Sequence, residues 1–426
     1  MTRRLSDFEL ERSNRSRFVG LNHRGWQMSA VIALAVGFSP TLMAESSQWS
    51  GFRGDGRSST DRSGPTTLGG EKATPSWQTS MPGQSVASVI AVDGMAVTSS
   101  SGGQDGERMY VTAVSVNDGT VVWQQEFEAT GRPYSHPTGA NAAPTAATDG
   151  QKLVAFFSSN DLVCLDKDGS LRWYRGMAVD HPKIGNDIGM ASSPVIADGV
   201  VVIQMESQGD PMVVGIDLST GEDLWQMARP ARSNWSSPVA IQRPDGATEV
   251  VIQSGSDLVA IEPQSGKEKW RFDEGGSNIA SSTPTGDFLL VPGGEVMALD
   301  VGGSASRPEV VWRDNSLSPR NASLVVSGDR MYSLKGSVII AADVASGKTI
   351  WKQRLGGLGG TWATPLMAGN RLYVFDQQGK AMIVQDNGDE AEIVEETELP
   401  DGVYGSPAMI GDVLVVRGRR NLYGFR

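Results

Sequence analysis

Short alternating runs of apolar and polar residues fill the chain from about residue 73 onwards. Runs such as VIADGVVVIQ (195–204) and LMAGNRLYVF (366–375) are broken by brief turns that contain Gly, Asp or Asn. An alternation of period two indicates β-strands, because successive side chains of a strand point to opposite faces. Helical periodicity is missing after residue 45. The pattern therefore predicts an all-β fold of short strands joined by tight turns.

A longer unit, with a glycine four residues before a tryptophan, repeats along these strands. It occurs in GIDLSTGEDLW (215–225), SVNDGTVVW (115–123), LDKDGSLRW (165–173), AIEPQSGKEKW (260–270), AADVASGKTIW (341–351) and, with an enlarged turn, ALDVGGSASRPEVVW (298–312). These tryptophans lie 39 to 52 residues apart, which leaves room for about four short strands in each unit. Repeats of this length and content are typical of β-propeller blades.

A second element, ending in proline, stands near the start of most units. It reads NAAP (141–144), ASSP (191–194), WSSP (235–238), SSTP (281–284), WATP (362–365) and YGSP (404–407). Seven units are visible up to about residue 397, the last without a tryptophan. The C-terminal residues then supply only three strands, and ATPSWQTSM (73–81) supplies the fourth. We therefore predict an eight-bladed propeller of four-stranded antiparallel blades, closed by the N-terminal strand; a seven-bladed ring is the alternative if the seventh unit is degenerate.

The recurring tryptophans are predicted to be structural. A ligand would not need one indole for every blade, whereas an indole at a blade seam covers apolar surface and can donate its N–H to a backbone carbonyl. The residues with this predicted docking role are Trp77, Trp123, Trp173, Trp225, Trp270, Trp312 and Trp351.

The repeat resembles that of the pyrroloquinoline-quinone (PQQ) propellers over roughly residues 73–426. The shared features are the ALD..TGK..W pattern and the SSP strand start, and the resemblance implies that each tryptophan docks one blade on the next. This superfamily includes the quinoprotein dehydrogenases, which are enzymes, and BamB, a scaffold of the outer-membrane β-barrel assembly machinery. The segment QWSGFRGDGRSS (48–59) also resembles the leader of secreted PQQ-like propellers of the planctomycete type.

The available side chains argue against the dehydrogenase branch. Resemblance to those enzymes implies PQQ in the propeller axis with Ca²⁺ and a catalytic Asp, often under a vicinal disulfide, yet Cys164 is the single cysteine. Only His136 and His181 follow residue 44, and no compact Asp/Asn cluster of the EF-hand type occurs. We expect no catalytic residue, metal or cofactor. PQQ with Ca²⁺ belongs to the alternative, a PQQ-dependent dehydrogenase or another small-molecule oxidoreductase.

The N-terminus and the net charge bear on location and partners. An Arg-rich segment precedes the apolar run MSAVIALAVGF (28–38) and a small-residue end at Ala44, which together are typical of a secretory signal. The formal charge of −12 argues against binding to nucleic acid. We expect a signal peptide (1–44), an extended leader (45–72) and a propeller (73–426). The predicted protein is a periplasmic or secreted platform for envelope or secreted proteins, or for a small molecule at its channel mouth, and an uncleaved signal would anchor it to the membrane.

Three loops that follow outer strands contain the first candidate binding residues. The loops are ATGRPYSHPTGA (129–140), RGMAVDHPKIGNDIGM (175–190) and QMARPARSN (226–234), which propeller topology places on one face. Loops on a rigid scaffold often carry binding sites, and the alternative is that their polar groups satisfy exposed backbone and one another. The candidates are His136, Arg175, His181, Asp187, Arg229 and Arg232.

A second set of candidates stands three residues before the proline of each strand-start element. Inner strands line the axial channel of a propeller, so these residues are expected to ring its mouth. The aromatic members can stack on a sugar, a planar cofactor or a partner's side chain; the alternative is that they plug the channel or pack beneath loops. The candidates are Asn141, Ala191, Trp235, Ser281, Trp362 and Tyr404.

Overall fold

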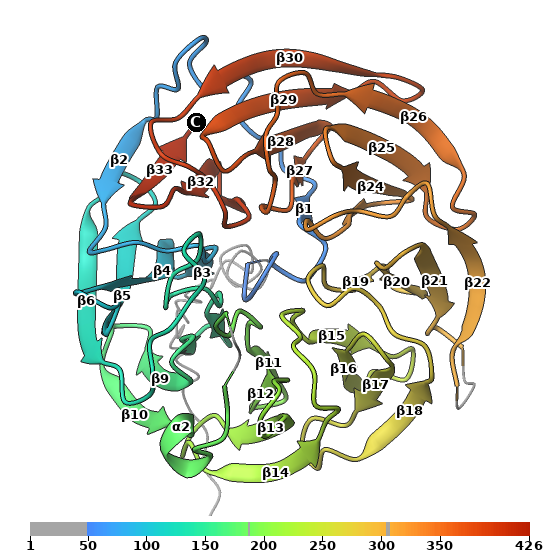
Figure 1. Cartoon of the computed structure of the whole chain (residues 1–426). Helices are drawn as coiled ribbons and strands as arrows, with labels where there is room; N and C mark the ends of the chain where they lie inside the picture. The colour runs from blue at the N-terminus through green and yellow to red at the C-terminus, as the bar shows by residue number, and fades with distance from the viewer. Residues whose placement is uncertain (1–48, 186–187, 304–306) are drawn as a thin grey trace, which may run out of the picture. The chain divides into compact units, whose positions relative to one another are not determined.

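The computed structural model describes residues 49–185, 188–303 and 307–426, so the predicted signal peptide lies outside the described residues. The described residues form eight sheets arranged as the blades of a propeller (Figure 1). The predicted eight-bladed fold is confirmed. The seven-bladed alternative is wrong, because the unit without a tryptophan is a complete blade that ends in β30 (Ala391–Glu398).

In blades 1 to 4 the strands run from the axis outwards in chain order (Figure 1). Blade 1 contains β3 (Ile90–Val92), β4 (Met95–Gly102), β5 (Arg108–Ser115) and β6 (Val121–Glu128). Blade 2 contains β7 (Ala147–Thr148), β8 (Lys152–Phe156), β9 (Asp161–Asp166) and β10 (Leu171–Gly176), followed by the short helix α2 (Met177–Asp180). Blade 3 contains β11 (Val195–Ala197), β12 (Val200–Met205), β13 (Met212–Asp217) and β14 (Asp223–Ala228). Blade 4 contains β15 (Val239–Gln242), β16 (Thr248–Gln253), β17 (Leu258–Ile261) and β18 (Glu268–Phe272).

Blades 5 and 6 repeat this order, and the last two blades also take a strand from the N-terminal part of the chain. Blade 5 contains β19 (Thr283–Pro284), β20 (Phe288–Val291), β21 (Val296–Asp300) and β22 (Glu309–Asp314). Blade 6 contains β23 (Val325–Ser327), β24 (Arg330–Lys335), β25 (Val338–Asp343) and β26 (Thr349–Arg354). Blade 7 contains β27 (Leu366–Ala368), β28 (Arg371–Phe375), β29 (Lys380–Asp386), β30 and, parallel to β27, the two-residue β1 (Ser59–Thr60). Blade 8 contains β31 (Ala408–Ile410), β32 (Val413–Arg417), β33 (Asn421–Phe425) and β2 (Trp77–Ser80).

The ring is closed by strands from both ends of the described chain. β2 pairs antiparallel with β33, in a register that sets Trp77 opposite Gly424 and Ser80 opposite Asn421. Figure 1 shows the blue β2 beside the red β33 at the rim. This confirms the predicted closure, which leaves blade 8 with no missing strand.

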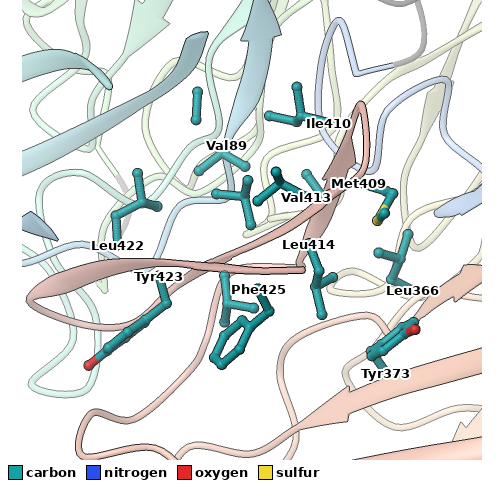
Figure 2. Packing of buried hydrophobic residues seen from close by; sticks show 14 of the residues in the cluster. Val89, Leu366, Tyr373, Met409, Ile410, Val413, Leu414, Leu422, Tyr423 and Phe425 are labelled. Carbon is teal, nitrogen blue, oxygen red and sulfur yellow. The ribbon is translucent and has the colours of Figure 1, made fainter. Parts of the chain in front are cut away.

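Apolar side chains fill the seams between neighbouring blades. Figure 2 shows the cluster at the closing seam, where Tyr373 of blade 7 and Leu414, Tyr423 and Phe425 of blade 8 pack together. All four side chains are buried. The strands β32 and β33 are buried along nearly their whole length, because each sheet lies between the preceding and the following blade.

The recurring tryptophans lie at the seams. Five indole N–H groups donate to a backbone carbonyl of the next blade at 2.7–3.0 Å, in the pairs Trp77–Val116, Trp123–Lys167, Trp173–Leu218, Trp225–Pro263 and Trp312–Val344. Trp351 donates instead to the Asp386 carboxylate of the next blade, and Trp270 to the Glu249 carboxylate of its own blade.

The turn glycine of a blade lies against the tryptophan of the blade before it. At Gly221, with φ of 77°, an added Cβ would lie 2.7 Å from the indole of Trp173. Gly199 has nearly the same φ, 76°, but an added Cβ there meets nothing within 4 Å. The turn glycine is therefore needed both for its backbone conformation and for the space that the indole takes.

We expect Gly221→Ala to destabilise the protein more than Gly199→Ala. Both substitutions place a side chain in the left-handed region, which costs about 1–2 kcal/mol. Only Gly221→Ala also collides with an indole, which adds about 1–3 kcal/mol. Urea unfolding of the two variants measures the difference. Equal losses would show that Trp173 moves away freely and does not hold the seam.

Residues 49–60 cross the inner ends of several blades before the first blade strand begins. The carbonyl of Trp49 accepts the N–H of Ala91 in blade 1 at 2.9 Å, and that of Ser50 accepts the N–H of Thr148 in blade 2 at 2.7 Å. Arg53 reaches blades 5 and 6, and β1 extends blade 7. This segment, which we call the leader plug, therefore spans the axis of the ring.

Candidate functional site

A closed ring of hydrogen bonds joins the inner ends of all eight blades. Each member is a serine or threonine whose backbone N–H donates to the hydroxyl oxygen of the member in the next blade, at 2.8–3.0 Å. All the members are buried. In order, this hydroxyl ring consists of Ser88, Thr145, Ser193, Ser237, Ser281, Ser323, Thr364 and Ser406, which donates back to Ser88.

The hydroxyl ring retains unused hydrogen-bonding capacity. A hydroxyl group has one O–H donor and two lone pairs, and each of these oxygens accepts one backbone N–H. Within the part of the chain that the structure describes, none of the eight hydroxyls donates a hydrogen bond to another residue. All eight line one cavity, so their O–H groups are available to whatever fills it.

A second ring of side chains lies two residues earlier in each blade. Side chains at this spacing share one side of an extended chain, so the second ring lines the same cavity, and we call it the mouth ring. The cavity, about 360 Å³, is here called the axial pocket, and its volume falls within the range of small-molecule sites. The mouth ring consists of Val86, Ala143, Ala191, Trp235, Ile279, Asn321, Trp362 and Tyr404.

Three aromatic residues of the mouth ring line the axial pocket from two sides. Trp235 belongs to blade 4 and Tyr404 to blade 8, which are four apart in a ring of eight and therefore lie opposite each other. Trp362, in blade 7, neighbours Tyr404 and is 41% exposed. The Trp235 N–H donates to the carbonyl of Gly189 at 2.9 Å, which fixes the orientation of that indole.

The leader plug forms the floor of the axial pocket. Phe52 lines the pocket, and the Arg53 guanidinium lies 5.2 Å from the centre of its ring. Arg53 is 2% exposed and donates to the carbonyls of Ser282 and Leu324 and to the hydroxyl of Thr283, with no carboxylate partner among the described residues. Burial lowers the pKa of Arg53 to about 9, so it still carries its charge at neutral pH.

The lining of the axial pocket has almost no charge. No Asp, Glu, Lys or Arg lines it along residues 49–185, 188–303 and 307–426, and its only imidazole is that of His136. Across these same ranges, no group of three or more His, Cys, Asp or Glu side chains is placed to hold a metal ion. The wall of the pocket can therefore offer hydroxyl, amide, aromatic and imidazole contacts, but it has no carboxylate, ammonium or guanidinium group among the described residues.

The strand-start candidates are mostly but not wholly at the mouth. Ala191, Trp235, Trp362 and Tyr404 belong to the mouth ring, and Ser281 belongs to the hydroxyl ring. Asn141 lies outside the pocket, where its amide donates to the carbonyl of Gly106 and accepts the N–H of Ser159. Counting three residues back from proline fails in blades 2 and 5. In blades 3, 4, 7 and 8 the proline directly follows the hydroxyl-ring residue, whereas in blades 2 and 5 it stands two residues away from the corresponding position. The true mouth residues are Ala143 and Ile279.

The two loops with His-Pro dipeptides lie side by side, since the N–H of His136 donates to the carbonyl of Ile188 at 3.0 Å. His136 is exposed at the rim of the axial pocket, and its Nδ1 lies 2.7 Å from the hydroxyl of Thr138. His181 is partly buried beside α2. Asp187 lies outside the described residues. Nothing in the described geometry brings the two imidazoles together as a metal site.

The arginine candidates differ in how far they are available to a partner. Arg175 pairs with Asp180 and with Asp223 of the next blade, and therefore links two blades. Arg232 is exposed and lines a shallow hollow with Arg320.

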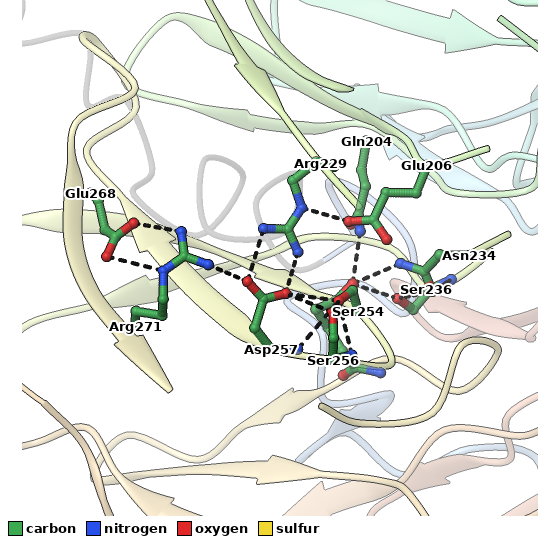
Figure 3. A network of polar contacts seen from close by, with 11 residues as sticks. Gln204, Glu206, Arg229, Asn234, Ser236, Ser254, Ser256, Asp257, Glu268 and Arg271 are labelled. Atoms are coloured by element: carbon green, nitrogen blue, oxygen red, sulfur yellow. Dashed lines mark hydrogen bonds and ion pairs between the residues drawn. The ribbon is translucent and has the colours of Figure 1, made fainter. Parts of the chain in front are cut away.

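Arg229 is 7% exposed and sits in a buried ionic network, not on the surface (Figure 3). It donates to Glu206 at 2.6 Å and to Asp257 at 2.7 Å, and Asp257 also pairs with Arg271. Burial raises the pKa of Glu206 although Arg229 opposes this. Burial would also raise the pKa of Asp257, but the bonds and charges of its arginines lower it below the usual range. Arg229 is thus a structural residue.

Eight four-stranded blades, joined at their seams by recurring tryptophans, define this chain as a PQQ-repeat β-propeller. It belongs to the family described as outer membrane protein assembly factor BamB, whose model matches residues 57–226, 187–300 and 292–426. No curated protein matches the sequence.

Similar solved structures come from both branches of the superfamily. BamB from Moraxella catarrhalis has a TM-score of 0.60 at 17% identity, covering 83% of this chain and 98% of that one. A europium-containing methanol dehydrogenase has 0.62 at 11%, covering 88% and 90%. Quinohemoprotein alcohol dehydrogenase from Comamonas testosteroni has 0.64 at 13%, covering 90% and 81%. At these identities the likeness concerns the fold. No helix among the described residues is long and apolar enough to cross a membrane.

Proposed function

We propose that this chain is an exported, non-enzymatic binding and assembly platform of the cell envelope. The observation that carries the proposal is the uncharged lining of the axial pocket, the place where the resemblance to quinoprotein dehydrogenases would put their cofactor. Membership of the BamB family supports a role in the envelope, with protein partners there. The predicted signal peptide (1–44) supports export.

The residues of the axial pocket do not fit PQQ with Ca²⁺. PQQ carries three carboxylates, and burying them without cationic partners is strongly unfavourable. Two arginines lie behind the lining and already donate to backbone carbonyls. Arg53 lies beyond Phe52 and donates to blades 5 and 6. Arg419 lies 5.7 Å from the centre of the Tyr404 ring and donates to the carbonyls of residues 137–139. Calcium binds six to eight oxygens and favours carboxylates, whereas no Asp or Glu among the described residues lines the pocket. We therefore derive no reaction step through this cofactor.

The purified chain is expected neither to bind PQQ nor to oxidise alcohols. An absorption titration with PQQ and Ca²⁺, followed by a dye-linked dehydrogenase assay, measures both. The control is a quinoprotein alcohol dehydrogenase reconstituted in the same buffer. Saturable binding together with turnover would overturn the platform proposal in favour of a quinone-dependent oxidoreductase.

A pull-down from envelope extract tests the platform directly. We expect the chain to retain a defined envelope protein through the face that carries the His-Pro loops, and a variant with His136→Ala and Arg232→Ala to retain less of it. Asp245→Ala is the matched control, because the β15–β16 turn lies on the opposite face of the ring. Equal recovery by all three proteins would move the partner surface elsewhere, and no recovery would count against the platform.

A further inference from the structure

We propose that the axial pocket binds an uncharged pyranose ring, such as the terminal sugar of a neutral glycan. This inference rests on the proposed platform function and names a ligand class for its one enclosed site. Three features of the pocket carry it: the hydroxyl ring, the facing aromatic walls and the lack of charge.

The hydroxyl ring matches the edge of a sugar. Each sugar hydroxyl both donates and accepts hydrogen bonds, and each ring member still has an O–H to donate and a lone pair to accept with. Eight such groups arranged around one axis can satisfy a polyol in several rotated positions. A purely apolar ligand would leave these buried donors unpaired, which is unfavourable.

The aromatic walls match the faces of a sugar. A pyranose has two largely apolar C–H faces, and an aromatic ring offers a flat apolar surface with a negative face. Trp235 stands on one side of the axis, and Tyr404 with Trp362 on the other, so a sugar bound in the pocket would have aromatic residues on both sides. The exposed position of Trp362 makes it the wall residue that solvent and ligand reach most easily.

The uncharged lining of the axial pocket favours neutral sugars over charged ones. His136 lies at the exposed rim, and inside the pocket no carboxylate, ammonium or guanidinium group among the described lining residues can pair with a charged substituent. The charged group of a uronic or amino sugar would therefore be buried inside without a counter-ion. Phe52 closes the floor, so the ring must enter from the mouth and a longer chain must extend out of it. The pocket is thereby suited to the end of a glycan.

The test is a binding titration of the full chain with methyl β-D-glucopyranoside, methyl β-D-galactopyranoside, methyl N-acetyl-β-D-glucosaminide and, as the charged probe, methyl β-D-glucuronide. Saturation-transfer NMR and tryptophan fluorescence are followed up to about 10 mM, where affinities in the millimolar range are still measurable. We expect saturable binding of at least one neutral sugar, and weaker binding of the glucuronide than of the glucoside.

Two pairs of variants separate the pocket from general effects. Trp362→Ala is expected to weaken binding at least tenfold without loss of fold, because the side chain is half exposed. Ser237→Ala is expected to weaken sugar binding several-fold. Ser237→Thr keeps a hydroxyl at this position, as Thr145 and Thr364 do in their blades, and is expected to bind the sugar as the parent does. Ser100→Ala, which removes a buried hydroxyl outside the pocket, is the matched control and should bind as the parent does.

Failure takes distinct forms. If the folded chain binds none of the neutral sugars, or if Trp362→Ala binds as well as the parent, the inference is overturned; an envelope protein retained in the pull-down would still leave the platform standing. Tighter binding of the glucuronide than of the glucoside would also overturn the inference, because the pocket would then not favour uncharged sugars. Binding of PQQ with turnover would overturn both proposals together.

Discussion

Replacing Arg229 by alanine is expected to lower the free energy of unfolding by about 3–5 kcal/mol, because breaking a buried ion pair leaves an unpaired charge behind. Glu206 is fully buried and has no other cationic partner among the described residues. Asp257 keeps Arg271 but loses two hydrogen bonds. Urea unfolding at neutral pH measures the loss.

Two comparisons attribute that loss to the buried charge. Arg313→Ala removes an exposed arginine that pairs with Glu274 and Glu295, and it should cost less than about 1 kcal/mol. Adding Glu206→Gln to Arg229→Ala should recover part of the stability, because the neutral amide needs no counter-ion. The pKa of Glu206 is raised in the folded state, so the deficit of Arg229→Ala should grow as pH rises. A double variant no better than Arg229→Ala would contradict this explanation.

Trp77→Ala is expected to cost about 3–5 kcal/mol, the range for a buried aromatic residue cut to alanine. Trp77 is 7% exposed, and its N–H donates to the carbonyl of Val116 in blade 1 at 2.8 Å. β2 has only four residues, so Trp77 supplies much of what holds it to β33. The loss should be accompanied by faster amide exchange in β33, measured by hydrogen–deuterium exchange.

Trp362→Ala is the matched control for the closing strand. It removes the same side chain from an exposed position in blade 7, where substitutions usually change stability by about 0.5 kcal/mol or less. If the two variants were equally stable, or if exchange in Trp77→Ala rose uniformly over all eight blades, Trp77 would not be the residue that keeps the ring closed.

The architecture could be predicted because it repeats. The Gly-to-Trp unit marks six blades, and Trp77, spaced 46 residues before Trp123, marks the strand that completes the last one. The leader plug could not be predicted in the same way. Its residues have no periodicity, and Arg53 finds its partners more than 200 residues away along the chain.

The candidate site was predicted only in part for a similar reason. Proline marks the strand start but does not fix its register, so counting from proline predicts Asn141 at the mouth, where the structure has Ala143. The hydroxyl ring could have been found by aligning Ser or Thr across the units instead of proline, since every blade supplies one. The sequence does not reveal that Arg229 is buried, because its partners Glu206 and Asp257 lie more than 20 residues away along the chain.

The shared blade also sets the order in which the molecule can be completed. Among the described strands β2 is the second and β33 the last, so any N-terminal fragment that ends before residue 421 lacks the partner of β2. The leader plug likewise lacks the partners of Arg53 until blades 5 and 6 are present, and the partner of β1 until blade 7 is present. Joining segments this far apart carries a loop-closure cost that only the finished ring repays. The ring can therefore close only when β33 is present to pair with β2.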